Sequence, residues 1–340
     1  MKTILAFAIT LVLGISACTE KTPPAPTVVT PTNLTLVAVV NPDNSGNVSF
    51  TATATNAAAF VFDFGTGSTQ TLATGNATYK YSTSGTYTVT VTAKSSTGQS
   101  VSKSILVNVT VTLSLVWFDE FNTDGLPDAS KWGYDLGAGG WGNNESQYYT
   151  SRPENATVAG GVLKITAKAE SYLGSSYTSA RLLSRGKYSF KYGRVEARAK
   201  LPAGAGTWPA IWMLGDNNST VGWPACGEID IMEHVGSQLN KIFGTVHHPG
   251  HSGGNADGGS VNISNATTEF HKYSLEWTST SIKFLVDDVL FYTFANTGSL
   301  PFNQNFFLIL NVAMGGNFGG AIDPAFTSAS MEIDYIRVYN

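Results

Sequence analysis

Three carboxylate side chains lie within six consecutive positions of this 340-residue chain. They are Glu228, Asp230 and Glu233, in the segment Glu228-Ile229-Asp230-Ile231-Met232-Glu233. If the segment is a strand, its side chains alternate between two faces, so Glu228 and Asp230 share one face while Ile229 and Ile231 share the other. Strict alternation would place Glu233 on the apolar face, where an unpaired carboxylate is unfavourable. One inserted residue would resolve this conflict.

We therefore predict a β-bulge near Ile231-Met232 that returns Glu233 to the face of the other two acids. Three carboxylates crowded together cannot all ionise freely at neutral pH, so we expect at least one raised pKa. A carboxyl pair about 5–5.5 Å apart is what retaining glycoside hydrolysis requires. In that interpretation Glu228 attacks the anomeric carbon and Glu233 is the general acid/base. Asp230 hydrogen-bonds Glu228 and holds its charge and orientation.

Two other interpretations of the acidic segment stay open from the residues alone. Three acids in a strand are often only its solvated face. A metal site is the second, because His247, His248 and His251 follow soon after, and carboxylates with histidines suit zinc. The chain has no HExxH spacing, however, and the Gly and Pro residues around the histidines indicate a loop.

The elements that must position the acids are strands. All seven tryptophans lie beyond residue 113, where polar and apolar residues alternate without long helical periods. The clearest strand patterns cover residues 194–201, 281–286, 289–294, 306–310 and 331–339. Asp287-Asp288 between the second and third pattern predicts a hairpin. About ten strands over roughly 225 residues predict an all-β fold, a two-sheet β-jelly-roll sandwich, for residues 113–340.

Residues 33–112 form a separate compositional block, rich in Thr, Val, Ser and Ala and without tryptophan. Period-two runs separated by turn signals predict a small immunoglobulin-like β-sandwich here. Residues 18–32 contain several prolines and read as an extended linker.

Residues 1–17 are expected to be a signal peptide rather than part of the fold. Lys2 precedes an apolar run of about ten residues, too short to span a bilayer, and small residues lead directly to Cys18. The segment resembles a bacterial lipoprotein signal, which implies a lipid on Cys18 and a place in the bacterial envelope, at the outer membrane or cell surface. An ordinary secretory signal is the alternative. Cys226 would then be free, and we expect it to be a small buried apolar residue.

Charge excludes some partners. Charged residues make up 13% of the chain and the net charge is -4, so no strong field favours nucleic acid. Few clustered Lys or Arg residues argue against a sulfated polymer. We expect a monomer.

Several blocks resemble known families. Glu228-Ile229-Asp230-Ile231-Met232-Glu233 is similar to the E-I-D-x-x-E signature of glycoside hydrolase family 16, in particular its laminarinase-like members. The similarity continues through residues 117–121, 141–150, 192–202, 206–215, 311–317 and 334–339. Within the first block, residues 60–67 and 81–89 resemble the PKD-type immunoglobulin-like module, which mostly serves as a spacer.

The resemblance to family 16 implies a jelly roll with a concave cleft, Glu228 as nucleophile, Glu233 as acid/base and Asp230 as the assisting residue. The sugar-binding residues it implies are Asn143, Arg181, Trp208, Trp212, Trp223 and His247. Core packing is an equal alternative for Trp212. No cofactor is expected for catalysis. The family often carries a structural calcium, for which Glu120, Asp334 and the Gly161 carbonyl are the matching positions.

The activity implied is a retaining endo-cleavage of β-1,3-glucan. The same fold acting on mixed-linkage β-1,3-1,4-glucan or on a red-algal galactan is the alternative, and Phe318 stands where laminarinases commonly have tryptophan. A surface glycan-binding lipoprotein without turnover is a second alternative, which the three intact acids argue against.

Overall fold

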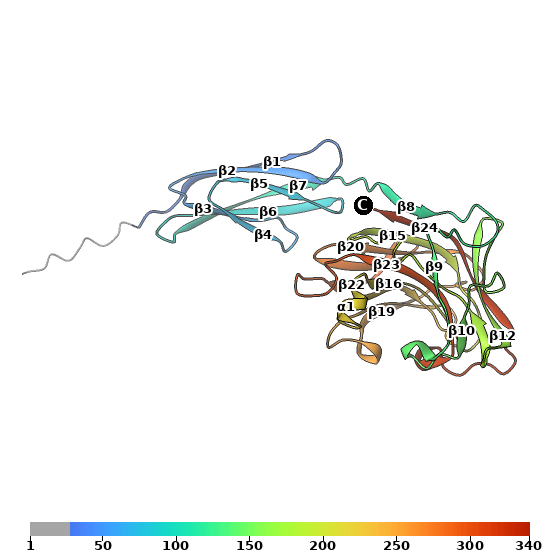
Figure 1. The fold of residues 1–340 in the computed structure, drawn as a ribbon. Helices are drawn as coiled ribbons and strands as arrows, with labels where there is room; N and C mark the ends of the chain where they lie inside the picture. Colours follow the sequence, from blue (N-terminus) through green and yellow to red (C-terminus); the bar gives the residue numbers. More distant parts are fainter. Residues whose placement is uncertain (1–27) are drawn as a thin grey trace, which may run out of the picture. The chain divides into compact units, whose positions relative to one another are not determined.

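The computed structural model describes residues 28–340, whose regular structure is almost all β-strand (Figure 1). The predicted signal peptide, Cys18 and most of the linker lie outside the described residues. Within residues 28–340 no helix is long and apolar enough to cross a membrane. The strands before residue 110 form two small sheets, here called the N-terminal module, and the strands after residue 114 form two larger sheets, here called the C-terminal domain. The all-β expectation is confirmed.

The N-terminal module consists of two sheets. One contains β1 (Thr32–Val40), β2 (Asn47–Thr55) and β5 (Asn76–Lys80). The other has the order β4-β3-β6-β7, with β3 (Ala59–Asp63), β4 (Thr69–Leu72), β6 (Gly85–Lys94) and β7 (Ser100–Val109). Phe50 of the first sheet packs on Phe62 and Phe64, with ring centroids 6.3 and 5.5 Å away. The module is therefore the small β-sandwich that the alternating runs predict.

The C-terminal domain is built on two larger sheets. The ten-stranded sheet contains β8 (Leu115–Asp119), β10 (Gln147–Tyr149), β11 (Ala156–Ala159), β12 (Val162–Tyr172), β13 (Ser175–Ser179), β15 (Gly193–Lys200), β20 (His271–Trp277), β21 (Ser281–Val286), β22 (Val289–Ala295) and β24 (Ser328–Tyr339). The seven-stranded sheet has the order β19-β18-β17-β16-β23-β14-β9. Its strands are β9 (Gly133–Asp135), β14 (Arg181–Leu183), β16 (Thr207–Gly215), β17 (Glu228–Glu233), β18 (Lys241–His247), β19 (Asp257–Asn262) and β23 (Phe306–Met314).

The core lies between these two sheets. Ile211, Ile229 and Ile231 of the seven-stranded sheet pack in one buried cluster with Leu275 and Ile333 of the ten-stranded sheet. Every residue of β23 in this sheet is buried. The face of the seven-stranded sheet that points away from this core carries the acidic residues of β17.

The strand count differs from the sequence-based expectation of about ten. Several strands, such as β9, β10 and β14, have only three residues, too few to show a period. The predicted hairpin is confirmed, because Asp287 and Asp288 connect β21 to β22 with φ of 49° and 65°, as a type I′ turn requires.

Residues 28–340 also contain four short helical segments. They are α1 (Asn218–Val221), α2 (Gly316–Gly319) and the 3₁₀ turns η1 (Gly140–Gly142) and η2 (Gly253–Asn255). Cys226 is a free, buried thiol whose neighbours include Leu214 and Phe307, as expected for a small apolar residue. Burial raises the pKa of this thiol to about 11.

Candidate active site

Strand β17 carries the predicted bulge. On β16, Trp212 pairs with Asp230 while the preceding residue, Ile211, pairs with Met232, so Ile231 is the inserted residue. The register against β18 shifts over the same interval, from Asp230 to Glu233. The bulge keeps Ile231 and Met232 in the core and turns Glu233 to the face of Glu228 and Asp230.

These three acids line a cleft of about 800 Å³. Its other walls include Trp141, Asn143, Glu145, Arg181, Trp208, Trp212, Trp223, Phe243, Thr245, His247, Asn311, Asn317 and Phe318. All six residues implied to bind sugar are in this set. The cleft thus gathers side chains from β14, β16, β17, β18 and β23, together with the turns η1, η2 and α2.

Two indole rings hold the two glutamates. Nε1 of Trp223 donates a hydrogen bond of 2.8 Å to Oε2 of Glu228, and Nε1 of Trp208 donates one of 2.8 Å to Oε1 of Glu233. An indole N–H is a donor only, so each bond favours the ionised carboxylate. Trp208 and Trp223 therefore orient catalytic acids in addition to presenting aromatic surface.

Asp230 faces His247. Nε2 of His247 lies 3.1 Å from Oδ2 of Asp230 and 3.7 Å from Oε1 of Glu228. The N–H of Gly253 donates to Nδ1 of His247 at 3.1 Å, so Nδ1 has no proton of its own. The proton of the ring is then on Nε2, the nitrogen that lies nearest to the two acids.

Burial raises the pKa of all three acids. The pKa values of Glu228 and Asp230 lie well above their ordinary values, first because of burial and then because of a neighbouring acid, Asp230 for Glu228 and Glu233 for Asp230. Burial also raises the pKa of Glu233, against the hydrogen bond from Trp208. A raised pKa was predicted from like-charge crowding, but loss of hydration contributes most.

Arg181 is held between two aromatic rings. Its guanidinium lies 5.0 Å from the ring centroid of Trp141 and 4.8 Å from that of Trp212, and Nε is 3.2 Å from Oδ2 of Asp135. Nε1 of Trp212 donates to Oδ1 of Asn311 at 2.7 Å. Trp212 thus both lines the cleft and packs within the protein, so neither of its two expected roles excludes the other.

Glu145 is a cleft residue that sequence reasoning did not select. Its carboxylate accepts hydrogen bonds from Gln147, Tyr149 and Asn143, at 2.6, 3.1 and 3.3 Å. Asn143 is therefore oriented by an acid two residues away. The role of Glu145 could not be predicted from strand alternation, because Glu145 lies between the turn η1 and the strand β10, where side chains do not alternate regularly.

The three positions implied for calcium lie on β24 or next to strands that pair with it, in the other sheet. Gly161 precedes β12 and Glu120 follows β8. Asp334 lies between Ile333, which pairs with β12, and Ile336, which pairs with β8. The Glu120 carboxylate accepts two hydrogen bonds from Arg337, at 2.7 and 2.9 Å, and Asp334 pairs with Arg198. Oxygen donors of this kind suit calcium, and its binding stays a prediction.

Two carboxylic acids with raised pKa values, placed among indole rings in a cleft, define an enzyme that cleaves glycosidic bonds. The chain belongs to family 16 of the glycosyl hydrolases, whose family model matches residues 143–337. A PKD domain model matches residues 22–111.

Individual relatives cover the C-terminal domain. The beta-glucanase of Rhodothermus marinus is 52% identical over 241 residues, which are 66% of this chain and 84% of that protein. The X-ray structure of the laminarinase from Rhodothermus marinus matches with a TM-score of 0.65 and 51% identity, over 67% of this chain and 98% of that one. LamA from Z. galactanivorans, in complex with laminaritriose and laminaritetraose, matches with a TM-score of 0.62 and 44% identity, over 67% and 99%. The expected jelly roll and glycoside hydrolase class are confirmed.

Proposed function

We propose that the protein is a retaining endo-β-1,3-glucanase that acts through Glu228 and Glu233. The observation that carries this proposal is the bulge of β17, which brings the half-buried Glu228 and the buried Glu233 to one cleft face, each accepting a hydrogen bond from an indole N–H. The relatives support the substrate, since one is named a laminarinase and another holds laminaritriose and laminaritetraose.

The reaction proceeds by two displacements at the anomeric carbon. In the first, a carboxylate oxygen of Glu228 bonds to that carbon, the glycosidic C–O bond breaks, and Glu233 gives its proton to the departing oxygen. In the second, Glu233 removes a proton from water, whose oxygen displaces Glu228. Two inversions leave the anomeric configuration unchanged.

Burial of the three acids bears on how they share a proton. The first step needs an ionised Glu228 and a protonated Glu233, and burial of three adjacent acids favours keeping a proton among them. His247 lowers the pKa of Glu228 and also that of Glu233. The proposed roles require the shared proton to be on Glu233 when the glycosidic bond breaks, because the leaving oxygen takes its proton from there.

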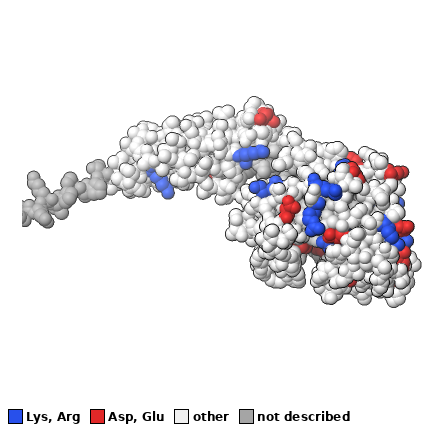
Figure 2. Space-filling view, viewed as in Figure 1, with Lys and Arg blue, Asp and Glu red and all other residues white. Residues whose placement is uncertain are grey.

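The charge of the cleft argues against a sulfated galactan. Arg181 is the one Lys or Arg among the residues that line the cleft, and it is already engaged by Asp135. On the face that Figure 2 shows, charges of both signs are mixed and most surface atoms belong to uncharged residues. A neutral glucan fits this surface better than an anionic polymer does.

Product analysis on laminarin, lichenan and agarose tests the proposal. We expect rapid release of short oligosaccharides from laminarin, slower cutting of lichenan, and early products with the β configuration by proton NMR. If the protein cuts lichenan or agarose but not laminarin, the assigned substrate is wrong, while the catalytic roles of the two glutamates still hold. Binding without turnover on all three would overturn the proposal, with Glu228→Ala protein as the inactive control.

We also propose that a lipid on Cys18 holds a monomeric enzyme at the bacterial envelope, with the N-terminal module as a spacer. Cys18→Ala should release the protein from the membrane fraction, and unchanged membrane association would contradict the anchor. Deleting residues 33–112 should spare activity on soluble glucan. Gel filtration of the protein without its signal tests the monomer.

A further inference from the structure

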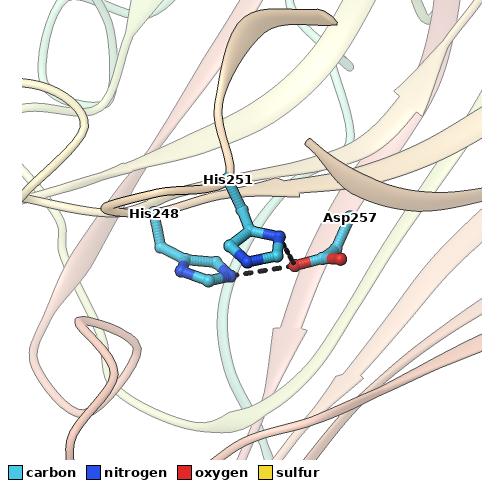
Figure 3. A group of neighbouring side chains, drawn as sticks. All are labelled: His248, His251 and Asp257. Atoms are coloured by element: carbon cyan, nitrogen blue, oxygen red, sulfur yellow. Dashed lines mark hydrogen bonds and ion pairs between the residues drawn. The ribbon is translucent and has the colours of Figure 1, made fainter. Parts of the chain in front are cut away.

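A second group of metal-ligand side chains lies beside the cleft but outside it. Nε2 of His248 and Nδ1 of His251 lie 3.0 and 3.1 Å from the same oxygen, Oδ2, of Asp257 (Figure 3). None of these three residues lines the cleft, and the reaction above uses none of them. The group therefore calls for an explanation of its own.

The backbone places these side chains before any ligand arrives. His248 and His251 are bridge partners, and each N–H donates to the carbonyl of the other, at 2.8 and 2.9 Å. Their rings stack with centroids 4.8 Å apart, and the buried ring of His248 packs on Phe294 and Phe302. Asp257 begins β19, where it pairs with β18. Little side-chain freedom is left to lose on binding.

The donor set and its spacing suit zinc. Imidazole nitrogen and carboxylate oxygen bind Zn²⁺ at about 2.0–2.2 Å, so neighbouring ligands of a tetrahedral site are about 3.3–3.5 Å apart. The two nitrogen–oxygen separations here are a few tenths of an ångström shorter, and all three ligand atoms lie within 4.8 Å of one another. A small outward movement of half-exposed His251 would open the site.

We propose that His248, His251 and Asp257 bind one zinc ion, with water at the fourth position. The ion would join the two ends of the loop that contains Gly253, whose N–H bonds to Nδ1 of His247. It would thus brace the turn that orients the histidine of the cleft. The proposal does not depend on the substrate, since the ligands lie outside the cleft.

Zinc titration of untagged protein, in competition with a chromogenic chelator and with millimolar calcium present, tests the site. We expect one zinc per chain and an affinity at least about tenfold weaker in His251→Ala. Asp257→Asn should weaken binding as well. His271→Ala is the matched control, because His271 pairs with Asp287 elsewhere on the surface and its loss should leave the affinity unchanged.

Glu228, Asp230 and His247 also lie close enough together to share an ion. A second measurement therefore distinguishes zinc binding at His248, His251 and Asp257 from zinc binding at the catalytic acids. Zinc should raise the melting temperature of wild type and of Glu228→Gln alike, but not that of His251→Ala. Metal-free melting curves verify that His251→Ala, which removes a half-exposed side chain, is folded. Absence of stoichiometric binding, or binding lost in Glu228→Gln and kept in His251→Ala, would overturn the proposal.

Discussion

Nε2 of His247 lies 3.1 Å from Oδ2 of Asp230, at the centre of the acidic face of β17. Because Gly253 donates to the other ring nitrogen, Nε2 is the nitrogen that carries the proton of the ring. Asp230 lies between two glutamates in sequence and is buried, so its charge would oppose theirs. The histidine offsets part of that repulsion and connects the acids to the loop after β18.

Glu228→Ala should remove turnover, because it removes the carboxylate that attacks the anomeric carbon. We expect kcat on laminarin to fall by about 10⁴-fold or more. Circular dichroism and binding of laminari-oligosaccharides should be preserved. Activity close to wild type would show that another residue is the nucleophile.

Glu233→Gln should lower kcat on laminarin by about 10²–10⁴-fold, the usual contribution of a general acid/base. A dinitrophenyl β-glycoside of laminaribiose needs no proton on its leaving group, so the first step should stay fast and release a burst of dinitrophenolate. Glu228→Ala should give no burst on the same substrate. Identical behaviour of the two variants would contradict their separate roles.

Trp208→Phe and Trp223→Phe should move opposite limbs of the pH–rate profile. Each change removes a hydrogen bond that favours an ionised carboxylate, so each raises the pKa of its glutamate. Glu233 must be protonated, and Trp208→Phe should shift the alkaline limb of kcat/KM upward. Glu228 must be ionised, and Trp223→Phe should shift the acidic limb upward. Movement of the same limb in both variants would refute this pairing.

Glu228→Gln should stabilise the protein at neutral pH. The pKa of Glu228 is raised in the folded state, so the folded chain holds its proton more tightly than the unfolded chain. Stability is then lost as pH rises above the ordinary carboxyl pKa. Each unit of the shift corresponds to about 1.4 kcal/mol, or about 3–5 °C in melting temperature. Melting curves should show a gain at pH 7.5 that disappears near pH 4, and a pH-independent difference would contradict this origin.

EDTA should lower the melting temperature without abolishing activity at low temperature, if calcium binds where β24 changes partners. Re-addition of calcium should restore this stability, since hard oxygen donors favour calcium. Glu120→Gln should remove the calcium response. Loss of activity in EDTA at temperatures where the protein stays folded would instead indicate a catalytic metal.

The alternation of polar and apolar residues was sufficient to predict which face of β17 is buried and where its bulge lies. Alternation relates neighbouring residues only, so Ile229 and Ile231 identify the core face wherever β17 lies in the sheet. The conflict at Glu233 then requires an inserted residue, and the register of β16 confirms it. The sequence could not give the number of strands, because elements of three residues have no detectable period.

By itself, the sequence determined the all-β class, the acidic strand and its bulge, since these follow from local alternation and from the cost of burying an unpaired charge. Only the tertiary structure decided that Trp141 and Trp212 enclose Arg181 and that Gly253 orients His247. It also decided that His248 and His251 meet Asp257. These contacts depend on which strands and loops become neighbours in the folded sheet, and that order is set by long-range packing, to which no short sequence pattern corresponds.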